Sequence, residues 1–120
     1  MAKKLGGLER IEEKKAIQAI QDINIFVEAL ENYNKDNGRY PNTQQGLKAL
    51  IEKLKLGKIP KSWGTEGYLE KNIVPKDPWG NDYFYLSPGV HNKNFDIVSY
   101  GADALPGGKQ DINSWNLDLN

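Results

Sequence analysis

Residues 77–115 read DPWGNDYFYLSPGVHNKNFDIVSYGADALPGGKQDINSW, and this stretch carries the clearest signals for the fold. The Asp-Pro-Trp-Gly-Asn run at 77–81 predicts a turn, because Pro78 fixes φ and Gly80 can adopt positive φ. Residues 82–86 and 95–100 are rich in aromatic and β-branched side chains, which is typical of strands. Because the connection between them is short, the two strands are predicted to pair antiparallel.

A long polar loop follows the second predicted strand and contains two carboxylates, Asp103 and Asp111. Loops of more than about 12 residues without secondary structure usually carry a function or are disordered. Calcium binds six to eight oxygen atoms, and backbone carbonyls serve as well as carboxylates. The loop lacks the D-x-D-x-D-G spacing of an EF-hand. The residues alone therefore leave two interpretations open, a calcium site or two solvated aspartates.

The other polar and aromatic residues of the stretch are interpreted structurally. Asp77 and Asp82 flank the predicted turn and are expected to accept hydrogen bonds from the local backbone. Trp79 and the aromatic residues 83–85 are interpreted as core residues rather than a sugar-binding platform, since aromatic side chains bury large apolar areas. His91 is the only histidine, and we interpret it as a solvated turn residue.

Upstream, residues 8–36 predict one long helix, which Gly38 can end by adopting the left-handed conformation. Apolar side chains recur there every three or four positions, as on one face of a helix with 3.6 residues per turn. They are Ala16, Ile17, Ile20, Ile23, Phe26, Val27, Leu30 and Tyr33. We expect Ile20, Ile23, Val27 and Leu30 to face the strands and a second helix, so that the long helix serves as a spine.

The second helix is predicted at residues 43–55, because Asn42 and Gln45 have the spacing of a capping box. Its apolar stripe consists of Leu47, Leu50, Ile51 and Leu54. The following segment, 56–76, is interrupted by glycine and proline, and we expect Trp63, Tyr68 and Leu69 to fasten it to the long helix. Helices followed by strands indicate an α+β fold, and 120 residues suffice for a single domain spanning 1–120.

Composition excludes several classes of protein. Lys+Arg and Asp+Glu are both 16, so the chain lacks the basic excess typical of nucleic-acid-binding domains. Cysteine is absent, which excludes disulfides, thiol catalysis and cysteine-based metal sites. No run of 18 apolar residues is present to span a membrane. No serine lies in a G-x-S-x-G motif and no acid–base pair is evident, so an enzyme is not expected.

The order of five motifs resembles the major pseudopilins of the type II secretion system, over residues 16–115. The motifs are Asp36-Asn37-Gly38-Arg39-Tyr40-Pro41, Gln44-Gln45-Gly46-Leu47-Lys48-Ala49-Leu50, Pro75-Lys76-Asp77-Pro78-Trp79-Gly80-Asn81, Ser99-Tyr100-Gly101-Ala102-Asp103 and Asp111-Ile112-Asn113-Ser114-Trp115. The resemblance implies a pilin-like α+β fold with a long N-terminal helix, a second short helix, a small antiparallel sheet and a C-terminal calcium-binding loop.

The resemblance also implies ligands for that calcium. Asp103 and Asp111 match the family's aspartates, and Tyr100 and Leu105 match positions that supply backbone carbonyl oxygens. Gln110 and Asn113 are further candidates for the ligand set. The chain departs from the family at Ala104, where glycine is frequent, at Gln110, where an acidic residue is frequent, and at Asn113-Ser114, where the family has Gly-Asn.

A structural, non-enzymatic role follows from the same resemblance. Family members are subunits of the periplasmic pseudopilus, a helical homopolymer whose growth exports folded proteins across the outer membrane. Its partners would be further copies of itself, other pseudopilins and inner-membrane components of the system. The full-length protein would lie in the inner membrane and periplasm of a Gram-negative bacterium. The chain is expected to follow a hydrophobic helix that it lacks, and by itself to be soluble.

Three alternatives make different predictions. A type IV pilin or minor pseudopilin also has the long helix, but pilins usually close the C-terminal loop with a disulfide, which this chain cannot form. A calcium-dependent glycan-binding module predicts an exposed aromatic cluster beside the metal. An enzyme requires an acid–base pair or an activated nucleophile.

Overall fold

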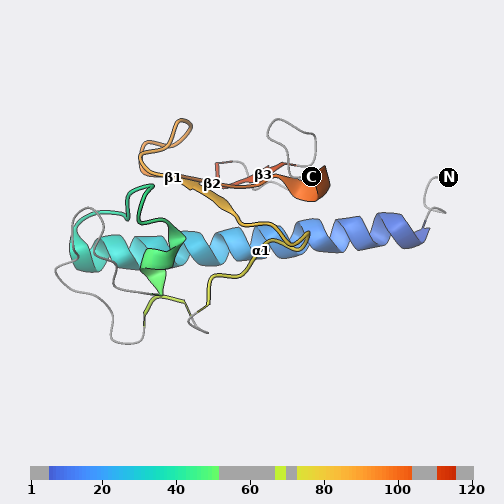
Figure 1. Ribbon diagram of the computed structural model, residues 1–120, viewed down its shortest axis with the longest axis horizontal. Coiled ribbons are helices and arrows are strands. Elements are labelled where there is room, and N and C mark those ends of the chain that lie inside the picture. Colours follow the sequence, from blue (N-terminus) through green and yellow to red (C-terminus); the bar gives the residue numbers. More distant parts are fainter. Residues whose placement is uncertain (1–5, 52–66, 70–72, 104–110, 116–120) are drawn as a thin grey trace.

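The computed structural model describes residues 6–51, 67–69, 73–103 and 111–115, with side chains in the first range from residue 13 onward. The elements in chain order are α1 (Gly6–Asn37), the 3₁₀ helix η2 (Leu47–Leu50), β1 (Phe84–Leu86), β2 (Asp96–Ser99), the 3₁₀ helix η3 (Gly101–Asp103) and β3 (Ile112–Asn113). One long helix lies along one side of a small sheet (Figure 1). Of the helices in these residues, none is both long and apolar enough to cross a membrane.

Helix α1 confirms the predicted long helix, with ends two residues earlier and one residue later than expected. Gly38 adopts φ 80°, and its N–H donates to the carbonyl of Asn34 at 2.7 Å, which ends the helix. The helix face that packs into the core is centred on Ala19, Phe26 and Tyr33.

The predicted set of core-facing residues on α1 is right only in part. Ile23 and Leu30 are fully buried, whereas Ile20 and Val27 are only half-buried. Ile17, also part of the predicted stripe, is exposed. The buried face follows the seven-residue spacing of 19, 26 and 33, so the apolar stripe is wider than the contact that the rest of the chain makes with it.

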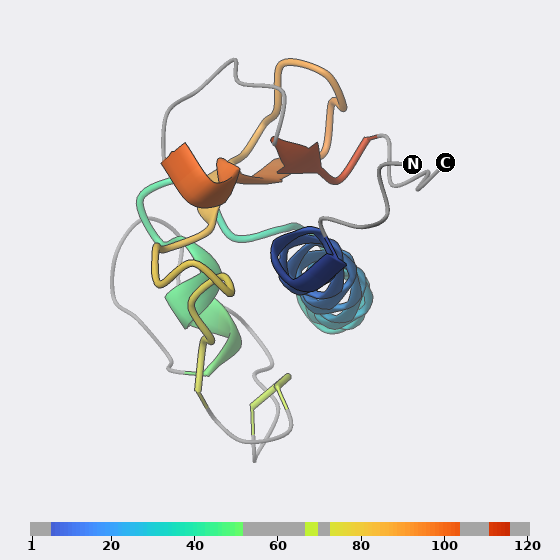
Figure 2. The same ribbon diagram turned by 90° about the vertical axis from the view of Figure 1, so that its right-hand side faces the viewer.

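The two predicted strands are present, shorter than expected, and antiparallel. Strand order is β1-β2-β3, and β2 pairs on both edges, with Phe84 opposite Val98 and Val98 opposite Asn113. Side chains alternate between faces, so Tyr85, Ile97 and Ser99 point toward the core. Viewed along the helix (Figure 2), the sheet lies on one side of α1 and η2 on another. The sequence did not predict β3, which is only two residues long.

The predicted second helix is wrong over the residues that can be compared, since only Leu47–Leu50 forms a helix there, a single 3₁₀ turn. The capping-box pair does form, with Asn42 N–H donating to Gln45 Oε1 at 2.9 Å and Gln45 N–H to Asn42 Oδ1 at 2.8 Å. It closes a turn instead of starting an α-helix, because Gly46 then adopts φ 64°. Residues 52–55 lie outside the described part of the chain.

Residues 67–69 are fastened to α1 as predicted. The Tyr68 ring lies 5.4 Å from that of Tyr33, its hydroxyl donates to Asp36 Oδ2 at 2.8 Å, and Leu69 is buried in the core. Trp63, expected to act with them, lies outside the described residues.

Candidate functional site

The face of the sheet that points away from α1 carries an apolar hollow of about 480 Å³. Side chains from all three strands contribute to it, together with the loop between β1 and β2 and the residue that ends the described chain. They are Phe84, Leu86, Val90, His91, Asp96, Val98, Tyr100, Asp111, Asn113 and Trp115. Phe84, Val90 and Trp115 are among the most exposed large apolar side chains of the described residues. This hollow contains three of the predicted calcium ligands.

The turn at 77–81 holds the end of β2 in place. Asp77 is buried, and its Oδ1 accepts the N–H of Trp79 at 3.1 Å and of Asn81 at 2.8 Å, which confirms the predicted local bonding. Its Oδ2 accepts the Ser99 hydroxyl at 2.8 Å. For Asp82 the same prediction is wrong, since its carboxylate instead pairs with Lys76 Nζ at 2.8 Å.

A second buried carboxylate, Asp96, organises the loop between β1 and β2. Its Oδ2 accepts the N–H groups of Val90 at 2.8 Å and His91 at 3.0 Å, and its Oδ1 accepts that of Asn92 at 3.0 Å. Burial raises the pKa of Asp96, but these backbone N–H groups and the His91 ring outweigh burial and hold the pKa below its usual range. A Cβ added at Gly89 would lie 2.5 Å from Asp96 Oδ1, so only glycine fits there without displacement.

His91 is an exposed turn residue, as predicted, with its side chain 52% exposed, but its ring also has two partners. Its ring stacks on that of Trp115, with centroids 3.8 Å apart and planes 5° from parallel. Its Nδ1 lies 3.3 Å from Asp96 Oδ2. His91 therefore joins the buried carboxylate of β2 to the C-terminal end of the described chain.

The segment 111–115 is held along β2 by backbone and side-chain bonds. Ser114 N–H donates to the Ile97 carbonyl at 2.9 Å, and Ile97 N–H donates to Ser114 Oγ at 3.0 Å. Asn113 in β3 has a buried Oδ1 with no hydrogen-bond partner in the described part of the protein. A buried amide oxygen without a donor is costly, so this position suits a cation or an added donor.

The structure brings three predicted calcium ligands together and leaves the other three undetermined. Tyr100, Asp111 and Asn113 line the same hollow. Burial and then the charge of Asp111 raise the pKa of the Tyr100 hydroxyl. Asp103 is the last residue of η3, and Leu105 and Gln110 lie outside the described residues. Within the part of the chain that the structure describes, no three His, Cys, Asp or Glu residues gather as a metal site.

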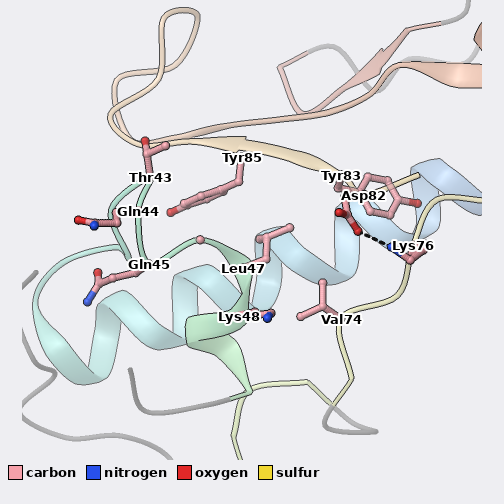
Figure 3. A pocket seen from close by; sticks show the side chains of 11 residues that line it. Thr43, Gln44, Gln45, Leu47, Lys48, Val74, Lys76, Asp82, Tyr83 and Tyr85 are labelled. Carbon is pink, nitrogen blue, oxygen red and sulfur yellow. Dashed lines mark hydrogen bonds and ion pairs between the residues drawn. The ribbon is translucent and has the colours of Figure 1, made fainter. Parts of the chain in front are cut away.

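A second, more polar hollow of about 510 Å³ lies between η2 and the start of β1 (Figure 3). Its lining includes Lys48, Gln45, Tyr83 and the Lys76–Asp82 ion pair. The side chains of that pair are largely exposed, so water screens the interaction.

Sequence reasoning missed Asp96 and its link to Trp115. The sequence predicts Asp96 only as part of a strand, and no local motif marks an aspartate whose donors lie four to six residues earlier. The one available signal is Gly89 before a run of polar turn residues, which indicates a close backbone approach.

Comparison with known proteins agrees with this architecture. A model of the family described as "Type II secretion system (T2SS), protein G" matches residues 7–115. The chain is 44% identical over 114 residues to the type II secretion system core protein G of Pectobacterium carotovorum subsp. carotovorum, covering 95% of this chain and 69% of that protein. It is also 44% identical over 112 residues to the core protein G of Pseudomonas aeruginosa, covering 91% of this chain and 77% of the relative.

A solved structure is similar throughout. The crystal structure of the major pseudopilin from the type 2 secretion system of enterohaemorrhagic Escherichia coli superposes with a TM-score of 0.83 at 33% sequence identity. The match covers 95% of this chain and 93% of the other. The long helix with a small antiparallel sheet is therefore a pilin-like α+β fold.

Proposed function

Because the chain belongs to the type II secretion system protein G family, the major pseudopilins, we propose that it assembles into a periplasmic filament whose growth exports folded proteins. The observation that carries this proposal is the family match over residues 7–115 together with the shared fold. Contacts between two different complementary surfaces of a subunit produce an open helical polymer when the rotation between subunits does not close a ring. Other pseudopilins and inner-membrane components of the system would be its further partners.

The shape of α1 supports this role. The N-terminal turns of the helix extend beyond the sheet (Figure 1). A helix that projects from its domain can continue into further helix, and an apolar continuation would anchor the subunit and pack against neighbouring copies. The globular part would then contribute weaker lateral contacts. We therefore expect the chain by itself to sediment as a monomer at micromolar concentration.

Export in cells tests the filament proposal. The chain would be joined to the N-terminal apolar segment of the Pseudomonas aeruginosa relative and expressed in a strain of that species lacking its own protein G. We expect restored secretion, and surface filaments when the protein is overproduced. A stably produced fusion that restores neither would contradict the proposal. So would a tight, closed dimer of the isolated chain.

The proposed subunit also binds a structural calcium ion at the segment that precedes and includes β3. Asp111 and Asn113 would provide side-chain oxygens and Tyr100 a carbonyl, and Asp103, Leu105 and Gln110 are the candidates that would complete the set. The buried, unpaired Oδ1 of Asn113 supports the fit, because calcium prefers oxygen donors, including amide oxygens. The bound ion would offset the negative charge of the aspartates and join residues 100–113.

A calcium-dependent glycan-binding module is a second candidate, favoured by one observation. It predicts an exposed aromatic cluster beside the metal, and Phe84 and Trp115, 40% and 37% exposed, line the hollow that contains Asp111. Calorimetric titration with a panel of oligosaccharides, in calcium and in EDTA, tests it. Calcium-dependent heat of binding would support this function, and the absence of such heat would exclude glycan binding.

A further inference from the structure

We propose that His91, Asp96 and Trp115 form a clasp that positions segment 111–113 for calcium, although none of the three is a ligand. The inference rests on the calcium site proposed above and deepens it. It assigns control of calcium affinity to the loop between β1 and β2, residues 87–94. It makes His91 and Asp96 positioning residues.

The first link of the clasp joins the loop to the sheet. Asp96 is the first residue of β2 and is only 3% exposed. Its carboxylate accepts three consecutive backbone N–H groups, those of Val90, His91 and Asn92. Hydrogen bonds to a charged acceptor are about twice as strong as those between neutral groups. The backbone at His91 is therefore fixed relative to β2.

The second link is the His91 ring. The ring is held at its own backbone N–H and at Nδ1, 3.3 Å from the same Asp96 oxygen. It offers a flat surface at a defined place, and the Trp115 indole lies parallel to it at 3.8 Å. Aromatic stacking of this kind adds to the burial of apolar area, so the stack holds Trp115 against the loop.

The third link runs from Trp115 back to the calcium segment. Trp115 follows Asn113 by two residues and Asp111 by four. Between them, Ser114 exchanges two hydrogen bonds with Ile97. Strand β3 pairs with β2 at only two positions, and so short a strand has few bonds of its own to define it. The stack and the Ser114 bonds thus fasten the end of the segment from which Asp111 and Asn113 project.

The energetic consequence is preorganisation. A ligand set that is already ordered binds more tightly, because less ordering entropy is lost on binding. Partners that orient the ligands of a metal typically change its affinity by about 10–100-fold when they are removed. We expect loss of the clasp to weaken calcium affinity about tenfold, near the lower end of this range, because the Ser114 bonds remain.

Calcium titration by calorimetry tests the clasp directly. His91→Ala is expected to raise the calcium Kd about tenfold relative to the unmutated chain. His91→Phe keeps a flat ring for Trp115 but loses the Asp96 contact, and should recover most of the affinity. Asn94→Ala is the matched control, because Asn94 is an exposed residue of the same loop outside the hollow, and its backbone N–H and carbonyl still bond Asn92 and Ser87. It should bind as the unmutated chain does.

The outcomes separate the two proposals. Calcium binding by the unmutated chain with an unchanged Kd in His91→Ala would overturn the clasp and leave the calcium site standing. No calcium binding by the unmutated chain would overturn both. An equal loss of affinity in His91→Ala and Asn94→Ala would also overturn the clasp, since the effect would then not depend on the stack.

Hydrogen exchange supplies a readout that a purely structural role would not move. Coupling between two sites is reciprocal, so calcium should slow exchange of the amides of Val90, His91 and Asn92, which bind no metal. The slowing should disappear in His91→Ala. Exchange rates at these three amides that are the same in calcium and in EDTA would contradict the proposal.

Discussion

Asp96 organises the loop beside the outer face of the sheet, because its one buried carboxylate accepts three backbone N–H groups. Its folded-state pKa lies below its usual range. The stability it contributes is therefore complete above the unfolded pKa of about 4 and is lost as pH falls through the folded pKa. Acid should loosen this loop before it affects the core.

Asp96→Asn tests that expectation. At pH 7 the free energy of unfolding of the variant should be lower by about 1–3 kcal/mol. A neutral amide oxygen replaces the charged acceptor, and the amide NH₂ group finds no acceptor among the three backbone donors. Thermal melts from pH 7 to pH 3 should show a steeper fall for the unmutated protein than for the variant. Asp82→Asn, at an exposed ion pair, should change little at pH 7. Parallel curves for the unmutated protein and Asp96→Asn would contradict the assignment.

Gly89→Ala should destabilise through a steric conflict. The new Cβ would lie 2.5 Å from both Asp96 Oδ1 and the Asn92 carbonyl oxygen, and overpacking of this kind costs about 1–3 kcal/mol. Denaturant unfolding measures the cost. In a double-mutant cycle with Asp96→Ala, the two costs should sum to more than the double variant loses, because both act on one contact. Strict additivity would show that the conflict lies elsewhere.

At the scale of the element, α1 presents its apolar residues in two very different surroundings. Leu30 is fully buried and Ile25 is 53% exposed. We expect Leu30→Asp to prevent folding, because an unpaired charge enters the core. Ile25→Asp, the matched substitution on the same helix, should fold and lose little. Far-UV circular dichroism and melting decide it, and a Leu30→Asp variant that melts like Ile25→Asp would refute the packing of this face.

Val27 is less buried than the sequence predicts, which lowers the expected cost of placing a charge there. The sequence predicts Val27 as a core position equal to Leu30, yet it is only half-buried. Val27→Asp should therefore cost less than Leu30→Asp. Gln21→Ala, at an exposed position, should be nearly silent.

For the whole molecule, calcium should raise the melting temperature. A ligand that binds only the folded state adds RT ln(1 + [L]/Kd), about 2.7 kcal/mol at a hundredfold excess, which corresponds to roughly ten degrees for a domain of this size. EDTA should reverse the shift, and magnesium should substitute poorly because it demands octahedral geometry and retains water. Asp103→Ala and Asp111→Ala should each abolish the shift with helix content unchanged, since α1 lies elsewhere. Coincident melts in calcium and EDTA would contradict the calcium site.

Local signals in the sequence predicted what local physics controls. The periodicity of residues 16–33 and the left-handed glycine at 38 predicted α1, and the Pro-Trp-Gly turn predicted the carboxylate bonding of Asp77. The motif order also led to the correct family. The calcium ligands remain a prediction, although Tyr100, Asp111 and Asn113 do share one hollow.

By itself, then, the sequence determined the long helix, the two main strands, the turn before them and the family, because each depends on neighbours within a few residues or on motif order. Tertiary structure alone decided the rest. Gly46, with φ 64° and ψ −169°, turned a predicted helix into a 3₁₀ turn packed in the core. β3 exists only because β2 pairs with it, and His91 meets Trp115, 24 positions later in the chain, because Asp96 fixes the loop that contains His91. Such contacts depend on backbone groups brought together by folding, which residue types in order do not encode locally.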